Sequence, residues 1–196
     1  MKQKMPARDR HFLFFNTKHR TMDKPIVIKN PFHKLEGYNC FGCSPDNRMG
    51  LRMNFRIEGE EVLCDWTPEQ QFQGWVGVLH GGIQATLMDE MASWLVFVKL
   101  KTAGVTSKME VNLLKPVMME KAPFRLKAVL TEMRRNIALI KVELFMNDGT
   151  LGAESMMHYF TYPQHIAHEK LYYPGIEHFL GQDDFSVSDN FPVENS

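Results

Sequence analysis

The chain has 196 residues, of which 44% are hydrophobic and 23% are charged, as is ordinary for a globular protein with a sizeable core. Its 23 Lys and Arg residues balance 23 Asp and Glu residues, so no sequence-wide basic field exists to attract nucleic acid. Three cysteines are an odd number and too few for a disulfide scaffold, which favours a reducing compartment. We therefore expect a cytoplasmic protein without a nucleic-acid partner.

No segment has the composition of a membrane span. The most apolar run, Met91 to Val98, is too short to cross a bilayer and is bracketed by Asp89, Glu90 and Lys99. The N-terminal cluster Phe12 to Phe15 is shorter than a signal-peptide core, and no small-residue cleavage site follows it. The sequence thus predicts no membrane partner.

Three regions differ in composition along the chain. Residues 1–30 are basic and aperiodic, which is typical of a flexible arm, whereas residues 31–162 alternate between periodic segments and turn residues. Residues 163–196 form a polar, increasingly acidic tail, in which residues 176–180 are expected to pack as a short helix. We therefore expect one domain at residues 31–162, with an arm before it and a tail after it.

Period-two alternation predicts strands on both sides of one helix. Residues 51–57 and 62–66 are expected to form a hairpin. Four more strands are expected after the helix, at residues 105–114, 124–132, 137–146 and 150–162, and Asp148-Gly149 suits the tight turn before the last of them. This order predicts a mainly antiparallel sheet.

Residues 82–100 carry the one strong helical pattern, and they are apolar on nearly all sides. A helix that is apolar all round must be buried. A curved sheet can wrap one side of such a helix, and a second copy of the sheet can complete the core. The fold class predicted is therefore α+β, with an antiparallel sheet wrapped around one long central helix.

The start of this helix carries a motif: His80-Gly81-Gly82, four residues, Leu87, one residue and Asp89. The motif resembles the signature of the hotdog-fold acyl-CoA thioesterases of the phenylacetate-thioesterase type. Segments Cys40 to Leu51 and Val111 to Pro116 are also similar to that family, and the resemblance covers about residues 38–162. It implies a hotdog fold, an acyl-CoA substrate hydrolysed to free acid and CoA, no metal or redox cofactor, and a homodimer or dimer of dimers.

The residue types suit this chemistry. A helix N-terminus presents free N–H groups and a positive dipole end, and Gly81 and Gly82 allow a substrate carbonyl to approach closely. Asp89 supplies a carboxylate that can act as general base or as nucleophile. Glu90, next to it, is a rival carboxylate.

The spacing of the motif favours a shared site. Asp89 follows Gly82 by seven residues, which is about 10 Å along a helix axis. Groups that act on one thioester carbon must lie within about 3 Å of it. Two antiparallel copies of the helix would bring Gly82 of one chain near Asp89 of the other, across a two-fold interface. The resemblance implies the same arrangement.

By resemblance, Gly82 is an oxyanion donor, His80 fixes the loop, and Thr106 falls where relatives carry a Ser or Thr that positions the nucleophilic water. The chain departs from the family at Gly74, where many relatives have an Asn that contacts the substrate carbonyl. Gln73, beside it, is the candidate substitute.

Cys40 and Cys43 form a Cys-x-x-Cys pair, and His33 and Cys64 bring the number of nearby ligand types to four. The absence of a second well-spaced pair argues against structural zinc, and small half-buried cysteines in a loop are favoured. Lys115 and the turn Arg134-Arg135 remain open as either phosphate contacts or ordinary surface charges.

Two alternative functions are compatible with the same fold. A non-catalytic acyl-CoA binding or sensing module is supported by the missing Asn at position 74. Hydration or dehydration of an acyl thioester is less supported, because the paired Asp and His motif of such enzymes is not seen. The packing of Trp75, Trp94 and Phe97 is expected to decide which acyl group fits.

Overall fold

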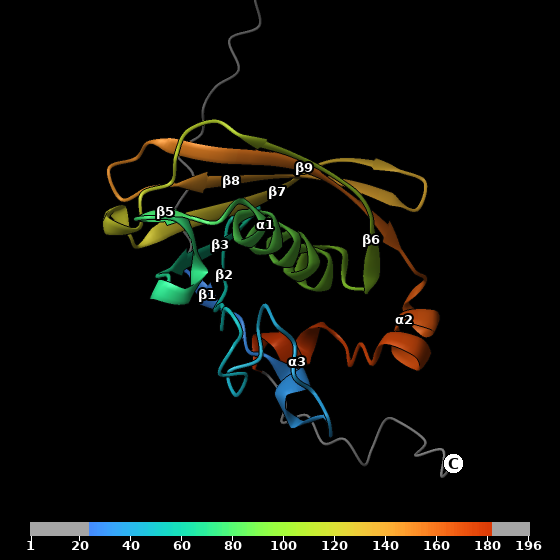
Figure 1. Ribbon diagram of the computed structural model, residues 1–196. Coiled ribbons are helices and arrows are strands. Elements are labelled where there is room, and N and C mark those ends of the chain that lie inside the picture. Colours follow the sequence, from blue (N-terminus) through green and yellow to red (C-terminus); the bar gives the residue numbers. More distant parts are fainter. Residues whose placement is uncertain (1–23, 182–196) are drawn as a thin grey trace, which may run out of the picture.

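The structure, a computed structural model, describes residues 24–181 (Figure 1). The predictions for residues 1–23, including the cluster Phe12 to Phe15, and for residues 182–196 lie outside the described residues. The division into an arm, a domain and a tail therefore stays a prediction. No helix within residues 24–181 is long and apolar enough to cross a membrane.

A seven-stranded antiparallel sheet forms one side of the molecule, with the strand order β1-β2-β3-β7-β8-β9-β6. The strands are β1 (Ile26–Val27), β2 (Arg56–Glu58), β3 (Glu61–Trp66), β6 (Gly104–Leu113), β7 (Phe124–Arg134), β8 (Ile137–Phe145) and β9 (Leu151–Thr161). A separate hairpin joins β4 (Gln73–Trp75) to β5 (Val78–Leu79). The four strands expected after the helix are confirmed.

Helix α1 (Gly81–Leu95) lies under the arched sheet, and its last turns, Val96–Leu100, have π-helical hydrogen bonding (Figure 1). Its most deeply buried side chains are at most 1% exposed: Leu87, Met88, Met91, Ala92, Trp94, Leu95. The predicted helix at 82–100 and the predicted α+β architecture are confirmed. Burial follows from the sequence because a helix without a polar face is stable only where every side is covered.

The side of α1 away from the sheet is covered by segments from near both ends of the described residues. The 3-10 turn η1 (Pro31–Lys34) and helices α2 (Gln164–Leu171) and α3 (Ile176–Leu180) lie there (Figure 1). Phe179 of α3 is fully buried, and its ring centroid lies 5.6 Å from that of Phe32 and 5.5 Å from that of Phe97. The short helix expected at 176–180 is confirmed, and the described part of the C-terminal segment packs onto the core.

The strand expected at 51–57 is wrong for most of its length, since β2 comprises only Arg56–Glu58. The alternation does mark burial, because Leu51, Met53 and Phe55 are each 3% exposed. However, Arg52 has a φ of 51°, which interrupts the extended backbone. The N–H groups of Leu51 and Met53 donate to the loop carbonyls of residues 41 and 42 rather than to a strand.

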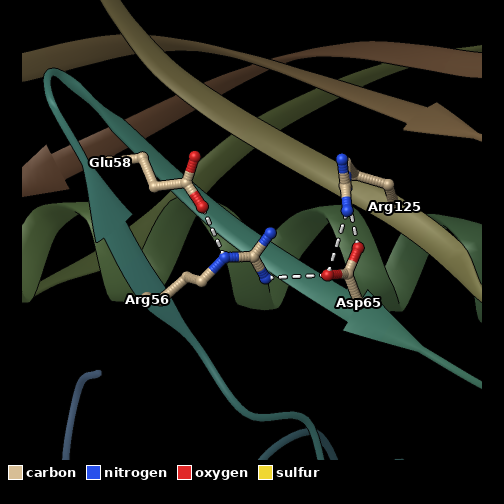
Figure 2. Close-up of polar contacts among 4 residues, drawn as sticks. All are labelled: Arg56, Glu58, Asp65 and Arg125. Carbon is tan, nitrogen blue, oxygen red and sulfur yellow. Dashed lines mark hydrogen bonds and ion pairs between the residues drawn. The ribbon is translucent and has the colours of Figure 1, made fainter. Parts of the chain in front are cut away.

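Four charged side chains link the strands β2, β3 and β7 (Figure 2). Asp65 lies opposite Arg125 in the register of β3 and β7, and its Oδ1 accepts from Arg125 Nε at 2.8 Å. Arg56 Nη1 lies 2.9 Å from Asp65 Oδ2, and its Nε donates to Glu58 at 2.7 Å. The neighbouring Arg125 guanidinium, followed by Arg56, holds the pKa of Asp65 below its ordinary value.

We expect Asp65→Asn to lower the free energy of unfolding by about 0.5–1 kcal/mol at neutral pH, since single exposed ion pairs contribute little and this carboxylate contacts two guanidinium groups. Because the folded-state pKa of Asp65 is lowered, its contribution is present above the unfolded pKa and is lost as the pH falls through the folded pKa. Urea unfolding at neutral and acidic pH measures this, and an equal difference at both would contradict it.

Candidate active site

His80 caps the N-terminus of α1. Its Nδ1 accepts a hydrogen bond of 2.9 Å from the backbone N–H of Gly82. A neutral imidazole that accepts at Nδ1 carries its proton on Nε2, which leaves that N–H as a donor. A Cβ at Gly82 would lie 3.1 Å from the ring, so any side chain there would press on His80. The ring therefore holds the loop at the helix start and also occupies the Gly82 N–H.

A groove of ≈ 540 Å³ opens at this end of the helix. Its lining includes Trp75, His80, Gly81, Gln84, Leu113 and Lys115. Trp75 is 78% exposed and Leu113 is 54% exposed, so large apolar side chains reach solvent around the helix N-terminus. The groove thus combines apolar walls, backbone donors and one cation, as a ligand site requires.

Gln84 is a polar residue of this groove that sequence reasoning missed. It is 3% exposed, and its Nε2 donates to the carbonyl of Leu79 at 3.0 Å. Its Oε1 has no hydrogen-bond partner within the described part of the chain. A lone amide in the buried stripe of the helix was the available signal, because buried polar atoms are normally paired.

Gly74 lies against His80, whereas the side chain of Gln73 is engaged elsewhere. A Cβ at Gly74 would lie 2.9 Å from Cδ2 of His80, so the missing side chain makes room for the ring. The side-chain carbonyl of Gln73 accepts from the N–H of Gly77 at 3.2 Å and holds the turn between β4 and β5. The structure therefore brings Gly74, but not the Gln73 side chain, to the groove.

Asp89 lies about two helical turns beyond Gly82 on α1 and contacts Thr106 of β6. Thr106 Oγ1 donates to Asp89 Oδ1 at 2.5 Å. A register shift between Thr106 and Lys108 marks a β-bulge, a feature that often re-aims side chains near functional sites. Burial raises the pKa of Asp89, and the Thr106 hydrogen bond opposes that rise.

Tyr159 of β9 faces the same place and was not found from the sequence. It pairs with Thr106 in the sheet register and interacts with the side chains of Ser93 and Thr106. Burial raises its pKa to about 12, so it carries its proton at neutral pH. Asp89, Thr106 and Tyr159 thus form a compact polar cluster on one side of α1.

Glu90 is directed to a different part of the molecule. Its Oε1 accepts from Trp94 Nε1 at 2.9 Å, and both of its carboxylate oxygens lie 3.8 Å from Cys40 Sγ. Asp89 and Glu90 therefore do not share one polar stripe. Of the two rival carboxylates, Asp89 has the contact with Thr106.

The groove and Asp89 lie toward opposite ends of β6. Gly81 is close to Leu113, because a Cβ there would lie 2.9 Å from Leu113 Cδ1, whereas Asp89 contacts Thr106. Seven residues of strand span about 23 Å. Within one chain, the groove and Asp89 are therefore separate, and an active site shared between two chains stays a prediction.

The candidate phosphate contacts, Lys115 and the turn Arg134-Arg135, lie in different places relative to the groove. Lys115 lines the groove. Neither Arg134 nor Arg135 lines it. Arg134 also donates to Glu132 through both Nε and Nη2, at 2.9 and 2.8 Å. Only Lys115 is placed beside the groove of its own chain.

We expect Thr106→Val to reduce turnover and to shift the acid limb of the pH–rate profile to higher pH. The valine cannot donate to Asp89, so the pKa of the carboxyl rises further above its ordinary value and its ionised form appears later. Thr106→Ser, which keeps the donor, should leave the limb close to that of the wild type. An unshifted limb in the valine variant would contradict this coupling.

The residues around this site are similar to a known protein family. Residues 76–153 match the family model described as thioesterase superfamily. The matched segment contains His80, Gly82, Asp89 and Thr106, and the resemblance to the thioesterase superfamily is confirmed there. No curated protein matches the chain.

Several solved structures share the fold. A thioesterase superfamily protein, RHA08564, has 19% identity and a TM-score of 0.55 over 60% of this chain and 57% of its own, so the match spans little more than half of that protein. A Streptococcus mutans UA159 protein bound to acetyl-CoA has 16% identity and a TM-score of 0.53, with 67% and 98% covered. A Haemophilus influenzae thioesterase has 17% identity and a TM-score of 0.52, with 58% and 80% covered. The predicted hotdog fold is confirmed.

Proposed function

We propose that this protein hydrolyses acyl-CoA thioesters to the free acid and CoA, as enzymes of the phenylacetate-thioesterase type do. The observation that carries the proposal is the hydrogen bond from Thr106 of β6 to Asp89 of α1. The N-terminus of the same helix opens into an apolar groove. The thioesterase superfamily match over residues 76–153 supports the reaction class. The neighbour from Streptococcus mutans that is bound to acetyl-CoA supports CoA as the thiol.

In the proposed reaction, Asp89 removes a proton from a water held by Thr106, and the water oxygen adds to the thioester carbonyl carbon. Negative charge then develops on the carbonyl oxygen, where the N–H groups of the helix start can stabilise it. Gly82 serves as this donor when its N–H is shared between the oxyanion and His80 Nδ1. The C–S bond breaks, and the CoA thiolate takes the proton from Asp89. In an alternative first step, the Asp89 carboxylate attacks the thioester carbon directly and displaces the CoA thiolate. The mixed anhydride that forms is then hydrolysed by water.

We infer that a two-fold dimer completes the site, alone or within a dimer of dimers. Among residues 24–181, strand β6 is at the sheet edge with β9 as its one neighbour, and its side chains Val105, Met109 and Leu113 are 42–54% exposed. An unpaired apolar edge of this kind is suited to pairing with another chain. A two-fold axis through the middle of β6 sets the Leu113 end of one chain against Thr106 of the partner. Each active site would then combine Gly82 of one chain with Asp89 of the other.

We assign Lys115 to the CoA phosphates, because it is the cation that the groove offers, and the exposed Trp75 to the wall of the acyl or pantetheine channel. We further place the reaction in the cytoplasm, since Cys40, Cys43 and Cys64 are all free thiols. We propose that the catalytic residues all lie within residues 31–162, onto which β1 and α3 pack.

Thiol release from short, long and aromatic acyl-CoAs tests the proposal directly. We expect turnover of at least one class, with Lys115→Ala raising KM more than it lowers kcat. The alternative is an acyl-CoA binding module, favoured by the Gly82 N–H that His80 already occupies and by Gly74 in place of an Asn. Calorimetric binding of acyl-CoA without any thiol release would select that alternative.

A further inference from the structure

Three potential metal ligands meet on the side of α1 that faces the 31–55 segment. Cys40 and Cys43 lie in the loop after η1, and Glu90 projects from α1. One ligand atom from each lies within 4.8 Å of the others, and Cys40 Sγ is 3.8 Å from either oxygen of Glu90. We propose that Cys40, Cys43 and Glu90 bind a thiophilic divalent cation of the Zn²⁺ class, which clips this loop to the central helix.

The spacing of these atoms fits tetrahedral coordination. Zinc lies about 2.3 Å from thiolate sulfur and about 2.0 Å from carboxylate oxygen, so a tetrahedral angle places the two ligand atoms about 3.5 Å apart. The separation between Cys40 Sγ and the carboxylate oxygens is only slightly longer. Three protein ligands leave the fourth position to a water molecule. Little movement is therefore needed to close the site.

Gly42, between the two cysteines, lets the carboxylate approach this turn. A Cβ at position 42 would collide with the Glu90 carboxylate, so the close approach requires glycine. The backbone N–H groups of Gly42 and Cys43 are directed toward the sulfur of Cys40. The loop is thus shaped around these ligand atoms rather than merely passing over the helix.

The electrostatics also favour a cation. Glu90 is half-buried beside the two cysteine sulfurs and forms no salt bridge within residues 24–181. A carboxylate held against two thiol groups, away from any cationic side chain, is unfavourable unless a proton or a cation neutralises it. A bound Zn²⁺ would supply that charge, and binding would release the thiol and carboxyl protons to solvent.

A second layer of hydrogen bonds orients the ligands, as is usual around metal sites. Trp94 Nε1 donates to Glu90 Oε1 at 2.9 Å, and the hydroxyl of Tyr38 lies 2.8 Å from Cys43 Sγ. Asn30 donates to the Tyr38 oxygen at 3.2 Å. A cavity of ≈ 260 Å³ lined in part by Asn30, Cys43 and Trp94 provides an entry path.

The sequence argument against zinc rested on the lack of a second well-spaced pair of ligands. His33 and Cys64 were the candidates, but His33 Nδ1 instead contacts the carbonyl of Asn30 at 2.6 Å, and Cys64 is fully buried in β3. The third ligand in the structure, Glu90, is 50 residues from Cys40 in sequence. Local spacing could not have identified it.

Metal analysis of the full-length protein, purified under reducing conditions and dialysed against Zn²⁺, tests the site. We expect one Zn²⁺ per chain in the wild type and substoichiometric Zn²⁺ in Cys40→Ser, Cys43→Ser and Glu90→Gln. Cys64→Ala, which removes a buried cysteine outside the cluster, should retain the metal. Tyr38→Phe should weaken Zn²⁺ binding by about 10- to 100-fold, the usual effect of losing an outer hydrogen bond.

Two readouts on the wild type do not depend on variants that fail to fold. Co²⁺ in place of Zn²⁺ should give thiolate-to-metal charge-transfer absorption, and Zn²⁺ should slow alkylation of Cys40 and Cys43 as followed by mass spectrometry. Absence of stoichiometric metal, or alkylation at the same rate with and without Zn²⁺, would overturn the proposal. Either result leaves the hydrolysis at Asp89 untouched, since the metal site uses none of its residues.

Discussion

Asp89→Asn is expected to lower kcat for acyl-CoA hydrolysis by about 10²- to 10⁴-fold, the range typical for loss of a general base. Asn keeps the size of the side chain and its contact with Thr106 Oγ1, but it can neither accept a proton from water nor attack a thioester. Steady-state thiol release with the best acyl-CoA of the panel measures the effect. The loss should appear in kcat and kcat/KM together, because the interaction is made in the transition state.

The same variant should be at least as stable as the wild type at neutral pH. Burial raises the pKa of Asp89 in the folded state, so its ionised form costs the folded protein stability above that pKa, a cost absent below the unfolded pKa. Asn carries no charge and removes the cost. A folded, stable and inactive protein would therefore separate catalysis from structure in one experiment.

Matched replacements distinguish Asp89 from its rivals. Asp46→Asn makes the same chemical change at an exposed loop position and should leave turnover unaltered. If Glu90 were the base, Glu90→Gln would show the loss and Asp89→Asn would not. Full activity of Asp89→Asn would remove Asp89 from the mechanism.

Phe179→Ala is expected to lower the free energy of unfolding by about 3–5 kcal/mol, as large-to-small changes at fully buried aromatic positions do. Phe179 is 0% exposed, and its ring centroid lies 5.5 to 5.8 Å from those of Phe32, Trp94, Phe97 and Tyr173. Alanine would leave a cavity against the helix that carries Asp89. Urea unfolding measures the change.

Phe41→Ala provides the control, since Phe41 is 42% exposed and the same chemical change there should cost much less. A similar small loss at both positions would mean that α3 does not cover the helix in solution. Residues 176–180 would then belong to a solvated tail rather than to the core.

The central helix was predictable because its apolar pattern leaves no face for solvent, and Asp148-Gly149 marked a turn for local reasons. The prediction of a strand at residues 51–57 was wrong because the alternating burial there arises from loop hydrogen bonds around Arg52, whose φ is positive. Burial pattern alone cannot distinguish a strand from such a loop. The short helix at 176–180 was expected, but its packing against α1 was not, because its one aromatic residue, Phe179, lies in a polar segment.

In the candidate site, counting residues indicated that Gly82 and Asp89 are too far apart to act together, and within one chain the groove and Asp89 do lie toward opposite ends of β6. The hydrogen bond from Gly82 to His80 was not predictable, because it depends on which ring nitrogen faces the helix start. Tyr159 was missed because its contacts arise from packing between distant segments, whereas Gln84 was visible as a lone amide in the apolar helix.

The sharing of the active site between two chains is tested most directly by complementation. Asp89→Asn and Gly82→Val, each expected to be inactive alone, are co-expressed with different tags, and the heterodimer is purified through both. A shared site predicts about half of the wild-type activity per dimer, because one of the two sites is then built entirely from wild-type residues. A heterodimer as inactive as the two parent homodimers would show that Gly82 and Asp89 act within one chain and would contradict the account.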